Sequence, residues 1–160
     1  MKENSEIAVA INSSERLKLV YNYWLSIRGD RSMPSRKDFD PAKVAKALPG
    51  IAIVEVLRDP IDFRYRLIGT DIDYHSEKSH TGQLISEIPD RAAPNTVWQN
   101  FINICKSKLP SGRTVPYVGP HSEFLETRQI VLPFSNDDKN VHMVMAVIDY
   151  LRRPSPFDRN

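Results

Sequence analysis

The sequence predicts an α+β protein built on a five-stranded antiparallel sheet, with helices on one face and an N-terminal amphipathic helix. Two observations lead to this prediction. Prolines and glycines divide the chain into segments, and the long segments between them carry either helical or alternating apolar patterns. Two extended segments precede the longest helical one and three follow it, so the simplest arrangement inserts the helices between the second and third strands.

Composition limits the class of protein. Of the 160 residues, 41% are hydrophobic and 26% charged, a balance typical of one globular domain. No apolar run is as long as a membrane helix, the N-terminus lacks the features of a signal peptide, and the lone Cys105 excludes an internal disulfide. We therefore expect a cytoplasmic protein. The net charge of +2, with acids and bases interspersed, gives no indication of nucleic-acid binding.

We expect a flexible N-terminus over residues 1–14, one domain over 15–150 and a disordered tail over 151–160. The domain starts with an amphipathic helix over residues 15–28. Its apolar stripe either covers the outer face of the sheet or packs on a second subunit. We expect a homodimer through this stripe, whose members are Leu17, Val20, Tyr21, Trp24 and Leu25.

The middle of the chain predicts a hairpin. Asp40-Pro41 has the residue types that start a helix, here a short one that ends near Leu48. The branched run 51–57 and the alternating run 63–68 then read as two paired strands, and Gly69 marks a change of direction. Residues 71–94 are polar and without a strong period, which indicates short turns.

The second half predicts a long helix over residues 97–109 and strands over 113–118, 126–134 and 141–150. Both faces of the last strand are apolar. It should therefore lie in the centre of the sheet, covered on both sides.

Several short motifs occur in the order known from one family, and with them the chain resembles the PAS superfamily, more closely a bacterial family of small stand-alone PAS-like proteins. The resemblance covers roughly residues 17–150 and implies a PAS fold. The motifs are Tyr23 to Leu25, Arg28 to Asp30, Met33 to Arg36, Asp40-Pro41, Leu48-Pro49, Phe63 to Thr70, Thr81-Gly82 and Leu132 to Ser135.

In that fold the long helix faces the concave side of the sheet, where PAS domains hold ligands. Two interpretations stay open, an adaptable pocket and an ordinary filled core, because empty apolar volume costs stability. The candidate ligand-binding residues are Tyr65, Arg66, Tyr74, Trp98, Phe101, Ile102, Cys105 and Tyr117.

Arg66 is charged in a strand with apolar neighbours, so it needs solvent or a partner. We expect a structural ion pair with a carboxylate such as Asp30 or Asp149, with the acid group of a ligand as the alternative.

The resemblance disfavours two cofactors, and the ligand remains unidentified. Residues 103–106 do not reproduce the cysteine motif of flavin photosensors, and residues 95–109 contain no histidine that could bind haem. We expect no metal site and no catalytic residue, since the polar stretch from Asp71 to His80 lacks a dense ligand spacing.

The resemblance thus implies a regulatory or sensory PAS protein that binds a small molecule, a protein partner or both, without a fused output domain, rather than an enzyme. Composition and charge lead us to expect no membrane and no nucleic-acid partner. Two alternatives remain. One is a structural dimerisation scaffold with a filled core, and the other is a small hydrolase or isomerase that uses the Asp71 to His80 cluster.

Overall fold

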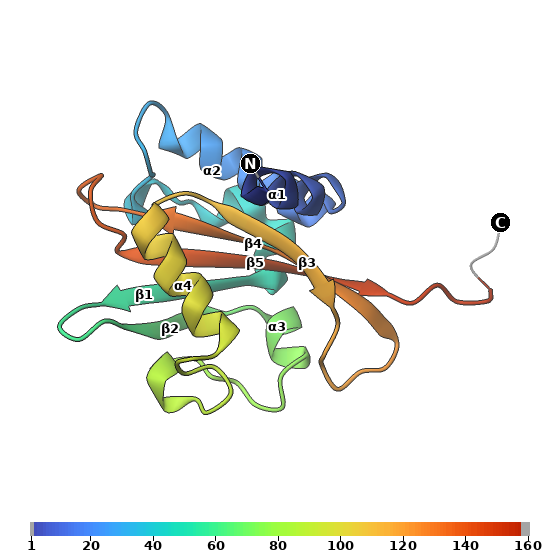
Figure 1. Cartoon of the computed structure of the whole chain (residues 1–160). Coiled ribbons are helices and arrows are strands. Elements are labelled where there is room, and N and C mark those ends of the chain that lie inside the picture. Colours follow the sequence, from blue (N-terminus) through green and yellow to red (C-terminus); the bar gives the residue numbers. More distant parts are fainter. Residues whose placement is uncertain (1, 158–160) are drawn as a thin grey trace.

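One antiparallel sheet organises the computed structural model, which describes residues 2–157 (Figure 1). Its five strands lie in the order β2-β1-β5-β4-β3, and every neighbouring pair is antiparallel. The predicted sheet and the predicted hairpin are confirmed. The strands are β1 (Ile51–Leu57), β2 (Asp62–Ile68), β3 (Ser111–Pro116), β4 (Phe124–Phe134) and β5 (Met143–Arg152).

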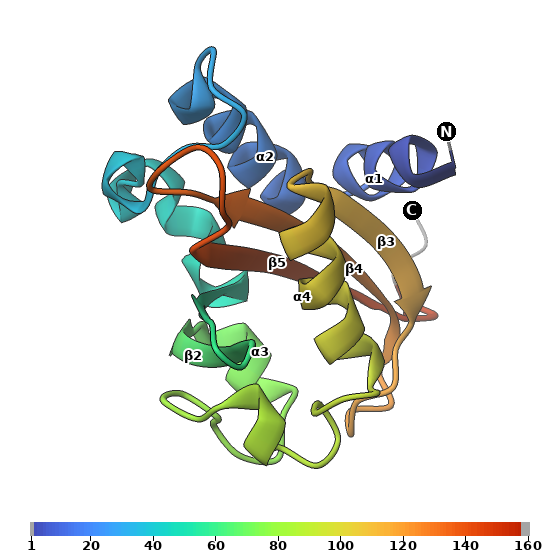
Figure 2. The same cartoon turned by 60° about the vertical axis from the view of Figure 1, so that its left-hand side comes forward.

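The helices form a layer on each face of the sheet (Figures 1 and 2). On one face lie α1 (Lys2–Asn12), α2 (Glu15–Arg28) and the 3-10 helix η2 (Pro41–Gly50). On the other lie α3 (Thr70–Tyr74), the 3-10 helix η3 (Ile85–Glu87) and α4 (Thr96–Ser107). A further 3-10 turn, η1 (Arg36–Asp38), follows α2.

Strand β5 is central and covered on both sides, as the sequence predicted. Val144 and Ala146 face α4 and pack in one apolar cluster, whereas Met143, Met145 and Val147 face α2 and pack in the other. The alternation follows from strand geometry, in which successive side chains point to opposite faces. The strand therefore joins two separate apolar cores.

Helix α2 belongs to the core of its own chain. The Ser14 side chain caps it by accepting a hydrogen bond from the Leu17 backbone N–H at 3.1 Å. Leu17, Val20 and Trp24 are at most 1% exposed and pack against the sheet and η2, while Tyr21 and Leu25 are partly buried. The expectation of a subunit interface is wrong for the three buried side chains, because the chain's own sheet covers them.

The N-terminus also differs from the expectation of a flexible segment. Residues 2–12 form α1, which packs beside β3, and Ala10 is fully buried there. The Ile7 backbone lies so close to β3 that a Cβ at Gly112 would be 2.9 Å from Ile7 Cα. At the other end β5 continues to Arg152, and residues 158–160 of the predicted disordered tail lie outside the described residues.

Candidate ligand-binding pocket

A cavity of about 880 Å³ lies between the sheet and the layer that contains α3 and α4. Its floor is apolar. Two residues with short side chains, Ala52 on β1 and Ala146 on β5, lie directly opposite each other in the strand register and leave space above the sheet. Val131 and Ile148 complete the floor. The walls carry polar and apolar groups, among them Tyr65, Arg91, Val97, Asn100, Phe101, Arg113, Tyr117, Thr127, Gln129 and Tyr150.

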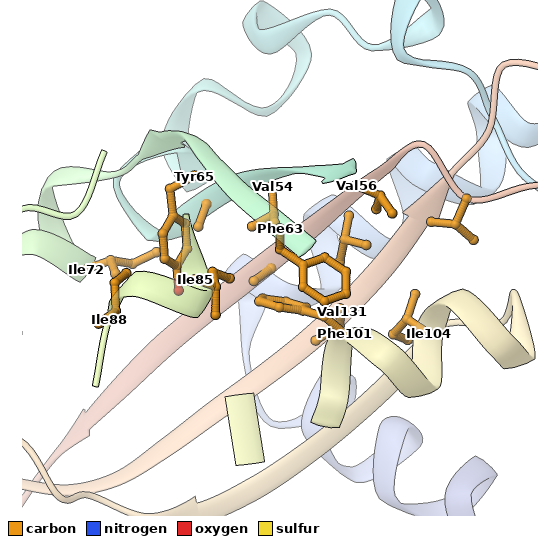
Figure 3. Packing of buried hydrophobic residues seen from close by; sticks show 14 of the residues in the cluster. Val54, Val56, Phe63, Tyr65, Ile72, Ile85, Ile88, Phe101, Ile104 and Val131 are labelled. Atoms are coloured by element: carbon orange, nitrogen blue, oxygen red, sulfur yellow. The ribbon is translucent and has the colours of Figure 1, made fainter. Parts of the chain in front are cut away.

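The same layer is tightly filled beside the cavity. Phe63 lies with its ring centroid 5.2 Å from that of Trp98 and 5.4 Å from that of Phe101. Figure 3 shows Phe63 and Phe101 packed together with Ile104 nearby, while Tyr65 lies on the side of Ile72 and Ile88. The filled core and the pocket that the sequence left open therefore occupy different parts of one layer.

The structure places three of the candidate ligand-binding residues, Tyr65, Phe101 and Tyr117, in the cavity wall. Trp98, Ile102 and Cys105 instead pack against the apolar cluster, and they do not line the cavity. Tyr74 and Arg66 are also outside the lining, and Tyr74 is 54% exposed. These five residues lie outside the cavity because helix and strand spacing alone does not show where the opposite wall is hollow.

Arg66 forms an ion pair, as expected, but with a different partner. Its Nε lies 2.7 Å from a carboxylate oxygen of Glu55 on the neighbouring strand β1. Asp149, one of the partners considered, lies instead 3.9 Å from Arg16. The pairing follows from the register, which sets Glu55 opposite Arg64 and thus diagonal to Arg66.

Arg91 enters the cavity wall from the segment between η3 and α4. Its guanidinium donates to the Tyr65 hydroxyl and to the Ser76 hydroxyl, each at 3.2 Å, and lies 5.5 Å from the centroid of the Tyr65 ring. Among the described residues Arg91 has no carboxylate partner within ion-pair distance. Burial raises the pKa of Tyr65, so its hydroxyl stays protonated at neutral pH.

A second arginine, Arg113, lines the cavity from β3. It lies opposite Gln129 of β4, whose amide oxygen, turned toward it, accepts from Nε at 2.6 Å and from Nη2 at 3.0 Å. Burial lowers the pKa of the Arg113 guanidinium, which nevertheless remains charged at neutral pH.

The residues from Asp71 to His80 do not form one reactive centre. Asp71 pairs with Arg16 at 2.7 Å, and the His80 ring hydrogen-bonds the Gln83 side chain at 2.7 Å. Within residues 2–157, no three histidine, cysteine or acidic side chains come together in a way that would hold a metal ion. Five polar residues of this stretch, His75, Ser76, Glu77, Lys78 and His80, instead contribute to the cavity wall.

His75 lies in an aromatic cluster that forms part of the cavity wall. Its Nδ1 lies 2.6 Å from the Tyr117 hydroxyl, and its ring stacks on Tyr150 with centroids 3.7 Å apart. His121 stacks on Tyr74 at 4.2 Å and thereby ties α3 to the loop between β3 and β4. The cluster consists of Tyr74, His75, Tyr117, His121, Phe124 and Tyr150.

The pKa of His75 predicts that acid weakens the fold. Burial lowers this pKa, and the nearby His121 and Arg152 lower it further, against the opposing effect of Asp71 and Glu123. The unfolded chain therefore binds the proton more tightly. The stability contributed by His75 is complete above the unfolded pKa of about 6.5 and falls as the pH drops below it.

We accordingly expect the His75→Gln variant to lose less stability than the wild type between pH 7 and pH 5. Urea unfolding at a series of pH values in this range measures the slope for both proteins. Equal slopes would contradict the assignment of the pH dependence to His75.

Several residues that line the cavity were not predicted from the sequence, although the alternation along the strands indicated the position of two of them. Arg113 is four residues before Tyr117, and Tyr150 is two residues after Ile148, so strand alternation places each on the inner face. Arg91 has no such signal, because its segment lacks a period.

A family model described as a PAS domain matches residues 12–148. The chain therefore belongs to the PAS domain family, which confirms the resemblance to the PAS superfamily and supports a sensory role. No curated protein matches it in sequence. No helix of the described chain is both long and apolar enough to cross a bilayer.

Two solved structures are similar in fold. One is a sensory box sensor histidine kinase from Vibrio cholerae, with 13% identity over 70% of this chain and 90% of that chain and a TM-score of 0.49. The other is a fungal LOV domain photoreceptor, with 10% identity over 87% of this chain and 96% of that chain and a TM-score of 0.45.

Proposed function

We propose that this PAS domain is a sensory module that holds a small organic molecule in the cavity beneath α4 and reports its presence to a protein partner. The observation that carries the proposal is the cavity itself. Its volume of about 880 Å³, its apolar floor and its few convergent polar groups are typical of a site for a molecule of drug-like size. Membership of the PAS family supports sensing rather than catalysis.

A physical connection from the cavity to the opposite face supports the second half of the proposal. Arg16 of α2 donates to the backbone carbonyl of Ile148 at 2.9 Å and to the Asp71 carboxylate at 2.7 Å. Ile148 lines the cavity, and Asp71 belongs to α3, whose Ile72 also lines it. A ligand that shifts α3 or β5 thus acts directly on a side chain of α2.

The partner surface that we propose lies on the outer side of the N-terminal helices. Val9 of α1 and Leu19 of α2 are 61% and 38% exposed, although both are large and apolar. A second copy of the chain is the first partner to test, by the mass of the protein in solution with and without ligand.

The cavity predicts that two buried alanines, Ala146 and Ala47, differ in how much stability is lost when each is replaced by leucine. Ala146→Leu extends a side chain into the cavity, so we expect its free energy of unfolding to stay within about 1 kcal/mol of the wild type. Ala47 is the matched control, since it is 1% exposed in the opposite cluster, where Ala47→Leu should cost roughly 1–3 kcal/mol by overpacking. Urea unfolding of both variants measures this, and equal losses would contradict an empty cavity.

Native mass spectrometry tests the sensory proposal directly. Gently purified wild type should carry an extra mass that denaturation releases, and Ala146→Leu should lose it. If the wild type is bare and a chemically mixed panel of metabolites does not raise its unfolding temperature, the proposal is wrong and a structural scaffold is favoured.

A further inference from the structure

We infer that the ligand of this cavity is an organic monocarboxylate whose acid group binds to Arg91. The inference deepens the proposed sensory function and rests on it. It starts from Arg91, a positive charge in the cavity wall whose hydrogen-bond partners are all uncharged.

The contacts of Arg91 hold its side chain in place without neutralising it. The two hydroxyls and the ring of Tyr65 orient the guanidinium, and all three are uncharged groups. A partly buried cation without an anion is unfavourable, whereas a guanidinium that keeps free N–H groups is suited to bind a carboxylate through two parallel hydrogen bonds. The fixed orientation lowers the entropy that ligand binding costs.

Tyr150 supplies a further donor in the wall of the same cavity. Its hydroxyl makes no hydrogen bond to the residues that the structure describes. Burial raises the pKa of Tyr150, and Arg91 is near enough to oppose this rise. The hydroxyl is therefore protonated at neutral pH and available as a donor to a ligand in the cavity.

The charges at the exposed mouth of the cavity favour a single negative charge on the ligand. Glu77, Lys78 and Asp90 line the cavity there, and together they are negative. Two carboxylates at the mouth repel a phosphate dianion more strongly than a monocarboxylate.

The rest of the cavity selects for an apolar body behind the acid. Beyond Arg91 the lining includes Ala52, Val97, Phe101, Val131 and Ala146. A volume of about 880 Å³ far exceeds the size of an acid such as acetate. A ligand with an alkyl or aryl chain buries this surface, and that burial supplies most of its affinity.

Isothermal titration calorimetry tests the inference with two probe pairs, octanoate with octanamide and 4-phenylbutyrate with 4-phenylbutyramide. The wild type should bind each acid at least roughly 10-fold more tightly than its amide. Arg91→Gln should weaken binding of the acids by roughly 10- to 100-fold and leave binding of the amides nearly unchanged. Arg91→Lys, which keeps the charge, should recover part of the preference for the acids.

Arg113→Gln is the matched control. Arg113 also lines the cavity without an ion-pair partner among the described residues, but it uses both Nε and Nη2 to bind the Gln129 amide, so the edge that would bind a carboxylate is occupied. Its affinity for the acids should change less than about threefold. A larger effect at Arg113 than at Arg91 would overturn the assignment of the acid group to Arg91. A far-ultraviolet circular dichroism spectrum and an unfolding temperature for each variant show that a lost affinity is not a lost fold.

The remaining outcomes separate this inference from the sensory function. Equal binding of acids and amides by the wild type, or retention of a neutral molecule in native mass spectrometry, overturns the inference and leaves the sensory function intact. A bare protein that binds neither the probes nor the metabolite panel overturns both.

Discussion

Gly69→Ala is expected to lower the free energy of unfolding by roughly 3 kcal/mol or more. A Cβ at this position would overlap the backbone carbonyl oxygens of Leu48 and Pro49. These atoms belong to the backbone of η2, so no side-chain rotation relieves the overlap, and the junction between β2 and α3 must move away from η2. The backbone angles of Gly69, φ −65° and ψ 156°, are open to alanine, so the whole effect comes from this close approach.

Gly29→Ala provides the matched control for urea unfolding. Gly29 has a φ of 60° and no heavy atom within 4 Å of its ideal Cβ, so alanine there is strained in its backbone but meets no neighbour. The ψ of Gly29 is −133°, outside the left-handed helical region, so we expect a loss of roughly 1–3 kcal/mol at Gly29. If Gly69→Ala loses no more unfolding free energy than Gly29→Ala, then η2 moves away from the new Cβ at little cost, and the prediction is wrong.

Trp24→Ala should remove roughly 3–5 kcal/mol of stability. Trp24 is 1% exposed, and its indole N–H donates to the Pro133 backbone carbonyl at 3.0 Å. The substitution leaves a void between α2 and the sheet and an unpaired carbonyl, while Arg28 loses the ring over which its guanidinium lies at 5.4 Å.

The concentration dependence of this loss distinguishes a core role from an interface role. Because Trp24 packs within its own chain, the loss should be the same at low and at high protein concentration. Trp98→Ala is the control on the other face, and its partial exposure predicts a smaller loss. If the stability lost in Trp24→Ala grows with protein concentration, Trp24 instead contributes to an interface between subunits.

The elements that the sequence predicted are those whose pattern is local. The apolar stripe of α2, the branched run of β1 and the two apolar faces of β5 each determine an element without reference to the rest of the chain. Helix α1 escaped prediction because its stability comes from Ile7 and Ala10 packing beside β3. Short helices of this kind depend on tertiary contacts more than on propensity.

The site was predicted less completely for a geometric reason. The apolar stripe that the sequence predicted on α4 contains side chains that point in two neighbouring directions around the helix axis. Val97, Phe101 and Ile104 point toward the sheet, and Trp98 and Cys105, one position further round, fill the flank. Sequence spacing does not distinguish these directions, because the difference depends on the size of the side chains that the sheet presents from below.

The pairing of Ala52 with Ala146 has a consequence for how the chain must align its strands. If β5 slipped by one residue along β1, Met145 and Val147 would turn toward α4, and Ala146 would turn toward α2. The slip would close the hollow on one side and open one under the N-terminal helices. Strand register in this protein therefore decides more than which residues are buried: it decides on which side of the sheet the molecule is hollow.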